Sequence, residues 1–191
     1  RGTQGMIETC KFARENDIPY LGLCLGMQIM VIEASRNLLG YQDANSSEFD
    51  ESTPYPVIDL MPEQLKSLHK GGSMRLGLYD CKLVDDTKSK SIYQSDIISE
   101  RHRHRYEVNN KFVGELEKVG LVTSGINPES ELVEIMEYIN HSFMIGVQFH
   151  PEFLSTPLNP HPLFVQFVKS GLEEINIKSN GKFINKSNIL E

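Results

Sequence analysis

The sequence of 191 residues predicts an α/β fold, with an open, mostly parallel, twisted sheet and helices on both of its faces. The first observation is an uninterrupted apolar stretch at residues 19–23, which is typical of a strand buried on both faces. The second is the helical spacing of apolar residues on either side of it, because strands that alternate with helices favour parallel pairing. The third is another apolar stretch at residues 143–149. We expect a further strand before residue 3, so that the first strand or strands of the sheet are missing.

Three segments make up the N-terminal part of the predicted fold. Residues 3–16 carry apolar side chains one helical turn apart, which predicts an amphipathic helix. Residues 25–39 predict a second helix that ends at Gly40, because glycine readily terminates helices. Residues 41–56 are polar and rich in turn-forming residues, so we expect a surface loop there.

The middle of the chain predicts extended structure separated by hydrophilic connections. Residues 57–60 are typical of a strand, and residues 61–70 of a short helix or an insertion. Residues 71–77 are rich in glycine and predict a turn that leads into an extended run at residues 78–84. The polar residues 85–91 then predict a loop.

An alternation of arginine and histidine follows. In a strand, successive side chains point to opposite faces, so Arg101, Arg103 and Arg105 share one face, and His102 and His104 the other. The arginine face is as typical of a solvated surface as of a binding site. We interpret the histidines as structural or domain-interface residues, because no third ligand stands at a spacing typical of a metal site.

The C-terminal part predicts the remaining elements. Residues 110–119 predict a helix and residues 121–126 a strand. Residues 132–138 and 143–149 predict a β-hairpin, whose second strand is strongly apolar. Residues 162–172 predict an amphipathic helix that closes the fold.

The composition, at 39% hydrophobic and 24% charged residues, is that of an ordinary globular domain. We expect one domain at residues 1–172, truncated at its N-terminus, and a polar tail at residues 173–191. The net charge of −7 argues against nucleic-acid binding, and no apolar run is long enough to span a membrane. Three cysteines of unrelated spacing form neither a disulfide framework nor a metal site, which predicts a reducing, cytoplasmic location.

Cys24 lies between Gly22 and Gly26, at the junction of the first strand and the second helix. This arrangement is typical of a nucleophile elbow, in which a tight turn excludes side chains at the flanking positions and strains the backbone of the nucleophile. The helix start also directs backbone N–H groups, Leu25 first, at the position of an oxyanion. The alternative is a buried cysteine in a core strand, with the glycines as ordinary turn residues.

His150 and Glu152 follow the second apolar strand, and their spacing predicts that they point to the same side. The imidazole would be the base for a cysteine nucleophile, and the carboxylate would orient it. The imidazolium and the helix dipole are predicted to lower the pKa of Cys24. An isolated His-Pro-Glu is more often a turn with a solvated carboxylate, but its pairing with the elbow is far more specific.

The segments PYLGLCLGMQ and GVQFHPEF resemble the catalytic signatures of class I (triad-type) glutamine amidotransferase domains. Within that family, NSSEF, GSMRLG and ERHRHRYE resemble the CTP synthase branch. The resemblance covers the chain up to about residue 172 and implies a flavodoxin-like sheet. It implies that Cys24 attacks the side-chain amide of glutamine to form a γ-glutamyl thioester, that His150 moves the proton, and that Glu152 orients His150.

The resemblance also implies where glutamine binds. Glu48 would meet the α-amino group, and Arg105 would complete the binding of a substrate that carries one cation and one anion. Arg75 is expected on a surface where GTP acts, with a plain salt bridge as the alternative. The full set of residues implied to bind glutamine or the oxyanion is Leu25, Gly26, Met27, Gln28, Glu48 and Arg105.

The resemblance implies partners outside these residues. An N-terminal synthetase domain of the same polypeptide would use ATP and Mg²⁺ to activate UTP and would accept the ammonia, with GTP as activator and a homotetramer as the assembly. No cofactor or metal is expected in the glutaminase domain itself. A glycine loop of the family, of which Arg1 and Gly2 would be the end, supplies the second oxyanion donor, and losing one such donor typically costs about 10²–10³ in rate.

Two other functions stay open at this point. One is a stand-alone γ-glutamyl cysteine hydrolase on the same fold, which would need no synthetase partner. The other is a catalytically silent regulatory module that docks a polyanion on its arginine-rich strand. The acidic net charge and the presence of Cys24, His150 and Glu152 disfavour the silent module.

Overall fold

The computed structural model describes residues 2–60 and 74–181, with side chains to residue 174. The predicted short helix or insertion at residues 61–70, the glycine turn at 71–73 and the end of the predicted tail at 182–191 lie outside the described residues. Arg1 also lies outside them. No described helix is long and apolar enough to cross a membrane.

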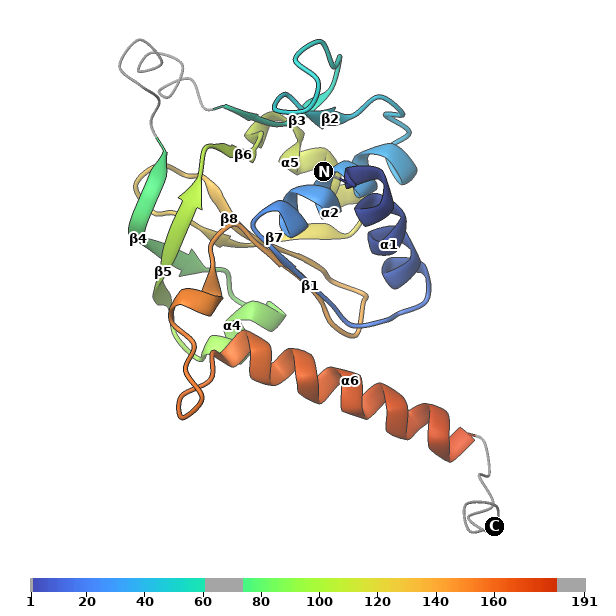
Figure 1. Ribbon diagram of the computed structural model, residues 1–191, viewed down its shortest axis with the longest axis vertical. Helices are drawn as coiled ribbons and strands as arrows, with labels where there is room; N and C mark the ends of the chain where they lie inside the picture. Colours follow the sequence, from blue (N-terminus) through green and yellow to red (C-terminus); the bar gives the residue numbers. More distant parts are fainter. Residues whose placement is uncertain (1, 61–73, 182–191) are drawn as a thin grey trace.

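Six strands form the main sheet, in the order β1-β9-β8-β7-β4-β5 (Figure 1). They are β1 (Tyr20–Leu23), β4 (Arg75–Leu83), β5 (Ile97–His104), β7 (Leu121–Ile126), β8 (Val133–Tyr138) and β9 (Met144–Val147). A smaller sheet has the order β2-β3-β6, formed by β2 (Asn45–Ser46), β3 (Pro56–Leu60) and β6 (Tyr106–Val108). The helices are α1 (Thr3–Glu15), α2 (Leu25–Asn37), α4 (Lys88–Tyr93), α5 (Val113–Lys118) and α6 (Pro162–Gly181), with 3-10 turns η2 (Asn110–Phe112) and η3 (Pro151–Phe153).

The α/β class is confirmed, but the main sheet is mixed rather than mostly parallel. Within the described part of the main sheet, only β1 and β9 pair in parallel, and the four other neighbouring pairs are antiparallel. The reason is the connections: β7, β8 and β9 follow one another through short turns, which permit only antiparallel pairing. The parallel pair joins strands from opposite ends of the chain, and it is the pair that precedes Cys24 and His150.

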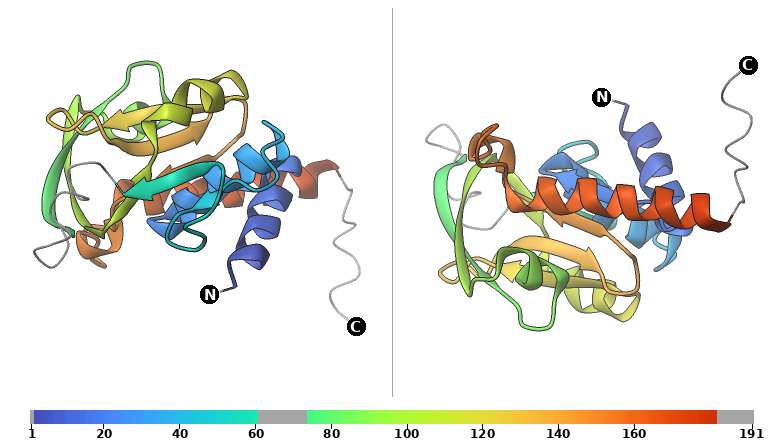
Figure 2. Two further views of the ribbon diagram at one scale, coloured as in Figure 1. Left: turned by 90° about the horizontal axis from the view of Figure 1, so that it is seen from above. Right: turned by 90° about the horizontal axis from the view of Figure 1, so that it is seen from below.

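Helices cover both faces of the main sheet, as predicted (Figures 1 and 2). One hydrophobic core lies under α1, α2 and α5 and includes Met27, Ile32 and Leu116. The other lies under α4 and α6 and includes Phe143 and Leu163. Successive side chains of a strand point to opposite faces of the sheet, so neighbouring residues of one strand pack into different cores.

Two predicted loops contain regular structure. The predicted loop at residues 85–91 is wrong in its second half, because α4 begins at Lys88, where the Thr87 side chain caps the helix by accepting a hydrogen bond from the Lys90 N–H at 3.2 Å. The predicted surface loop at 41–56 contains the short strand β2. The other predicted helices and strands among the described residues are confirmed to within a few positions.

The predicted loose tail begins too early. Helix α6 continues to Gly181, beyond the predicted end at residue 172, because its first turns pack Leu163 and Phe167 into the second core and anchor the helix. Val168 and Leu172 lie on its exposed side. Figure 2 shows α6 running across the lower side of the molecule.

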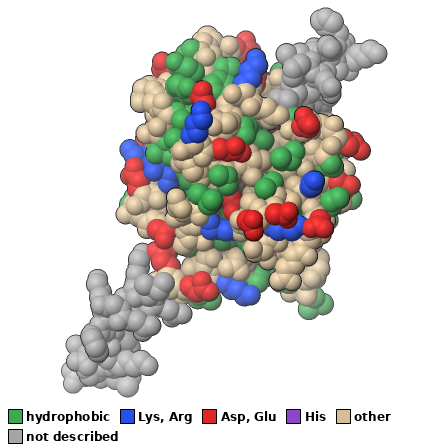
Figure 3. Space-filling view, turned by 180° about the vertical axis from the view of Figure 1, so that it is seen from behind, with side chains coloured by type: hydrophobic (Ala, Val, Ile, Leu, Met, Phe, Trp, Pro, Cys, Tyr) green, Lys and Arg blue, Asp and Glu red, His purple; other side chains and the backbone are tan. Residues whose placement is uncertain are grey.

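The alternation of arginine and histidine in β5 is confirmed. Arg101 and Arg103 are exposed, whereas His102 and His104 are buried. Arg105 stands in the bend between β5 and β6, outside either strand, and is exposed. The face seen in Figure 3 intersperses acidic and basic side chains, without a patch of one sign.

Candidate active site

The turn between β1 and α2 places Cys24 at the N-cap of the helix with φ 48° and ψ −99°, a positive φ that side chains rarely adopt. The Cys24 N–H donates to the Val147 carbonyl at 2.7 Å and so ties the turn to β9. A Cβ on Gly22 would lie 2.6 Å from the Gly26 carbonyl carbon, so glycine is required there. A Cβ on Gly26 would meet only the Tyr20 hydroxyl, at an ordinary 3.7 Å. The expected crowding therefore applies to Gly22 alone.

Burial raises the pKa of the Cys24 thiol to about 11. Hydrogen bonds from the Leu25 backbone N–H and the Gln148 side chain lower the pKa, and the negative charges of Glu152 and Glu48 raise it. The prediction of a lowered pKa is therefore wrong, because desolvation outweighs the donors at the helix start. The sulfur is a thiol at neutral pH, and the carboxylates lie close enough to act on it.

The structure reveals a sulfur partner that the sequence reasoning missed. Gln148 Nε2 donates to Cys24 Sγ at 3.6 Å, and Gln28 Nε2 donates to Gln148 Oε1 at 3.3 Å and to the Tyr106 carbonyl at 2.9 Å. Both glutamine side chains are buried. The available signal was that Gln148 is the polar residue within the apolar stretch 143–149.

His150 and Glu152 form the predicted pair, with 2.7 Å between Nδ1 and Oε1. The 3-10 turn η3, rather than an extended strand, brings the two side chains together. The His150 N–H donates to the Arg101 carbonyl at 2.9 Å, which fixes the turn to β5. Within the described residues, the side chain that donates to Cys24 Sγ is Gln148 and not His150. Because Nδ1 is bound by the carboxylate, Nε2 is the imidazole nitrogen left for proton exchange.

A pocket of about 340 Å³ opens at Cys24. It brings together five residues predicted to act in the site: Cys24, Leu25, Gln28, Glu48 and Arg105. Its other lining residues are Met74, Arg103, His104 and Tyr106. Met27 is instead a core residue, and the Gly26 carbonyl accepts a hydrogen bond from the Tyr20 hydroxyl at 3.0 Å.

Arg75 lies inside the fold rather than on the surface where it was expected, and a role for it in the action of GTP stays a prediction. It is 9% exposed, and its guanidinium contacts Glu134 at 2.8 Å and Glu107 at 3.2 Å. The salt-bridge alternative describes it better, although the bridge is internal. It lies inside because β4 turns Arg75 inward and exposes the neighbouring Leu76.

Arg75, His102, His104, Glu107 and Glu134 make a buried ion cluster, in which His102 Nδ1 and His104 Nε2 are 2.9 Å apart. Burial lowers the pKa of His102 to about 2 and that of His104 to about 3, and Arg75 adds to both shifts. Burial raises the pKa of Glu107 to about 8. The described residues contain no group of three or more side chains arranged to hold a metal ion.

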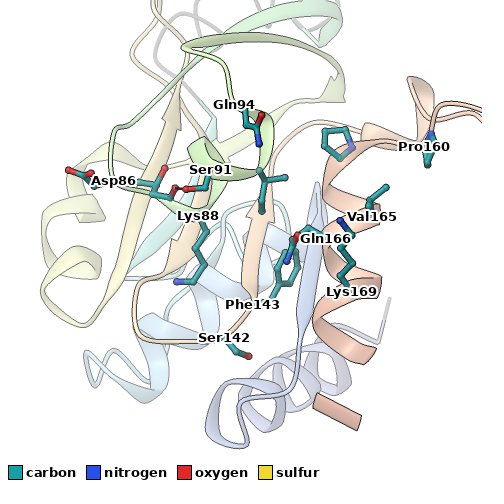
Figure 4. Close-up of a pocket in the computed structure, with 13 residues that line it drawn as sticks. Asp86, Lys88, Ser91, Gln94, Ser142, Phe143, Pro160, Val165, Gln166 and Lys169 are labelled. Carbon is teal, nitrogen blue, oxygen red and sulfur yellow. Dashed lines mark hydrogen bonds between the residues drawn. The ribbon is translucent and has the colours of Figure 1, made fainter. Parts of the chain in front are cut away.

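A larger cavity than the one at Cys24, of about 820 Å³, lies elsewhere (Figure 4). It lies beside α4 and α6 and is lined by Lys88, Phe143 and Lys169 among others. The Lys88 ammonium donates to the carbonyls of Tyr138 and Ile139, at 3.0 and 2.8 Å. None of the predicted site residues lines this cavity, so its size does not make it the active site.

Comparison with known proteins agrees with the geometry at Cys24. Residues 1–170 match the model of the family described as glutamine amidotransferase class-I. CTP synthase from Flavobacterium johnsoniae is 56% identical over 172 residues, and the CTP synthase from Caldanaerobacter subterraneus is 56% identical over 180. These matches cover 90% and 94% of this chain but 32% and 33% of those proteins, so the chain spans about a third of their length.

A solved structure is similar over most of the fold. The glutaminase domain of Trypanosoma brucei CTPS with bound acivicin superposes with a TM-score of 0.86 at 40% identity. The match covers 91% of this chain and 67% of that one. The family match, the sequence relatives and this structure confirm the resemblance that the motifs indicated. The chain therefore belongs to the class-I glutamine amidotransferase family.

Proposed function

We propose that this chain is the glutaminase part of a CTP synthase, hydrolysing L-glutamine and supplying the ammonia to a synthetase domain. The observation that carries the proposal is the pocket that joins the Cys24 nucleophile to the Glu48 carboxylate and the Arg105 guanidinium. A free amino acid presents one cation and one anion, so these two charges match its α-amino and α-carboxylate groups. Its side-chain amide would then reach the sulfur.

The proposed reaction begins when Cys24 Sγ attacks the amide carbon of glutamine as its proton passes to His150 Nε2. The oxyanion forms at the start of α2, where the Leu25 N–H already lies near the sulfur. His150 then gives the proton to the leaving nitrogen, ammonia departs, and a γ-glutamyl thioester remains. Water, deprotonated by His150, attacks the thioester and releases glutamate. Glu152 holds the imidazole through its 2.7 Å contact with Nδ1.

The partners of the proposal come from the curated relatives, which are about three times as long as this chain. The remaining length would include the N-terminal synthetase domain, which uses ATP and Mg²⁺ to activate UTP, with GTP as activator and a homotetramer as the assembly. No step in the glutaminase pocket uses these groups. The three free cysteines accord with a cytoplasmic location.

The test is Cys24→Ala in the full-length enzyme, assayed for CTP formation with glutamine and, separately, with added ammonium. We expect the glutamine-dependent rate to fall to background and the ammonium-dependent rate to persist, because only the first needs the nucleophile. Loss of both rates would argue against the assignment. Glutamine turnover that persists in the variant would remove Cys24 from the mechanism.

A diazoketone analogue of glutamine tests the substrate. The adduct is mapped by mass spectrometry and should lie on Cys24 and be prevented by glutamine. Cys10 and Cys81 serve as internal controls, because both are fully buried. Turnover of γ-glutamyl peptides without a synthetase domain would favour the stand-alone hydrolase instead, and failure to label Cys24 would favour the silent module.

A further inference from the structure

Two side chains and one backbone carbonyl, from separate parts of the fold, form a hydrogen-bonded line that ends on the nucleophile. Gln28 comes from the first turns of α2, Gln148 follows β9, and the Tyr106 carbonyl begins β6 in the smaller sheet. The distances along the line are 2.9 Å from Tyr106 to Gln28, 3.3 Å from Gln28 to Gln148, and 3.6 Å from Gln148 to Cys24 Sγ. Gln148 is fully buried and Gln28 nearly so.

The direction of every hydrogen bond in this line is fixed by its first member. The Tyr106 carbonyl can only accept, so Gln28 must turn its NH₂ group toward it. The second hydrogen of that NH₂ group then faces Gln148, which accepts the hydrogen bond with its Oε1 atom. Gln148 is left with its own NH₂ group facing the sulfur. A backbone carbonyl thus determines that Cys24 meets a donor rather than an acceptor.

We propose that Gln148 is a positioning residue of the glutaminase reaction, which holds Cys24 Sγ through its amide N–H and is itself oriented by Gln28. The inference rests on the proposed function of the site, although the contact to the sulfur does not. A donor favours the thiolate over the thiol, because a hydrogen bond to an anion is stronger than one to a neutral acceptor. Gln148 moves no proton; that proton still passes from Sγ to His150.

The line also changes the role expected of Gln28. Both hydrogens of its amide are engaged by Tyr106 and Gln148, so the group that Gln28 can offer to the pocket is its Oε1 acceptor. Gln28 would therefore accept a hydrogen bond from a substrate N–H and could not donate to a carboxylate. Gln28 thus serves the pocket and the nucleophile together.

The experiment measures the pH dependence of alkylation of Cys24 by iodoacetamide in the full-length enzyme, with the adduct quantified by mass spectrometry. Gln148→Met keeps the length of the side chain and removes the donor. We expect the apparent pKa of the alkylation to rise by about one unit, which is a tenfold loss of thiolate at a given pH and the size expected for one hydrogen bond to an anion. Gln148→Glu should raise it further, because a carboxylate adds negative charge.

Gln28→Met provides a second variant that leaves Gln148 in place. It should shift the apparent pKa in the same direction, and the double variant should show less than the sum of the two shifts, because both act through one contact. Gln166→Met, on α6 and away from Cys24, is the matched control and should leave the profile unchanged. Should alkylation of the buried Cys10 and Cys81 show that Gln148→Met is misfolded, Gln28→Met alone decides.

The outcomes separate the inference from the proposed function. An unchanged alkylation profile in a folded Gln148→Met or Gln28→Met enzyme overturns the positioning role, even if the diazoketone labels Cys24. A shifted profile together with no labelling by the glutamine analogue supports the contact and removes glutamine as the substrate. A merely structural role for Gln148 would lower the yield of folded enzyme without moving the pH profile.

Discussion

At the scale of single residues, Cys24 combines a positive φ with a thiol pKa raised to about 11. The backbone strain costs on the order of 1–3 kcal/mol and is balanced by the hydrogen bond to Val147 and by the close packing at Gly22. Because the sulfur is protonated at neutral pH, the proposed reaction must remove its proton as substrate binds. The structure therefore places the sulfur for attack but does not keep it ionised before substrate binds.

Arg105→Ala should raise the KM for glutamine by about 10- to 100-fold, because the pocket would lose a charge-assisted hydrogen bond to the substrate. Arg101→Ala is the matched control, since Arg101 is also exposed but does not line the pocket. The measurement is the KM of the full-length enzyme for glutamine and, separately, for ammonium. An equal KM for glutamine in the two variants would contradict a substrate role for Arg105.

The positions of the proposed catalytic residues were more predictable than their surroundings. The placement of Cys24 at the turn and the pairing of His150 with Glu152 could be predicted because each sits at the end of an apolar strand within a recognisable motif. The contact of Gln148 with Cys24 could not be predicted, because an amide carries no charge and does not titrate. Its proposed role follows only from the residues that it contacts in the fold. Arg103 likewise could not be assigned to the pocket from alternation alone, which gave it the same standing as Arg101.

At the scale of elements, the elbow depends on close approach between the end of β1 and the start of α2. Gly22 is the point of contact, because a Cβ there would lie 2.6 and 2.7 Å from the carbonyl carbon and oxygen of Gly26. Backbone atoms cannot rotate away as the end of a long side chain can. A side chain at position 22 would therefore displace the start of α2, the helix that carries Leu25.

Gly22→Ala should lower glutamine-dependent CTP formation about 100-fold, since displacing a reacting group by about 1 Å has an effect of this size. Gly5→Ala is the control: its Cβ would meet nothing within 4 Å, and it should stabilise α1 by roughly 0.5–1 kcal/mol. Both variants are compared in the glutamine and ammonium assays. Full glutamine-dependent activity in Gly22→Ala would show that the contact is not limiting.

The helices and strands could be predicted where the hydrophobic periodicity was strong. They were harder to predict where a turn or loop between elements determines the strand direction or the start of a helix. Strand pairing between β8 and β9 followed from their short turn. Helix α4 was hidden because its sequence is polar and its start depends on the Thr87 cap. The antiparallel character of most of the sheet was missed because helix–strand alternation holds only around β1.

At the scale of the whole molecule, two apolar cores enclose the sheet, and the buried ion cluster lies beside them. The cluster places one guanidinium among two carboxylates and two imidazoles whose lowered pKa values keep them neutral. The sequence alone could not place Arg75 inside, because β4 buries arginine on one face while Leu76 and Leu78 are exposed on the other. Ordinary hydrophobic patterning predicts the opposite arrangement.

Arg75→Met should destabilise the domain by about 3–5 kcal/mol, because Glu107 and Glu134 would be left buried without their cation. The measurement is the rate at which the buried thiol of Cys81 reacts with a disulfide reagent under native conditions, which reports opening of the domain. The rate should rise about 100-fold or more. Arg101→Met, at an exposed site, should leave it unchanged, and an unchanged rate in Arg75→Met would show that the carboxylates are accommodated without the arginine.

The parallel pairing of β1 with β9 has a consequence for the order in which the enzyme becomes competent. β1 and β9 are hydrogen-bonded neighbours, yet Cys24 and Gln148 are 124 positions apart along the chain. A nascent polypeptide leaving the ribosome therefore presents its nucleophile long before β9 and the proposed base exist beside it. In the proposed reaction, ammonia could therefore be released only after nearly the entire domain has been synthesised and β9 has docked. The topology would thus delay the proposed hydrolysis until β9 lies beside the elbow.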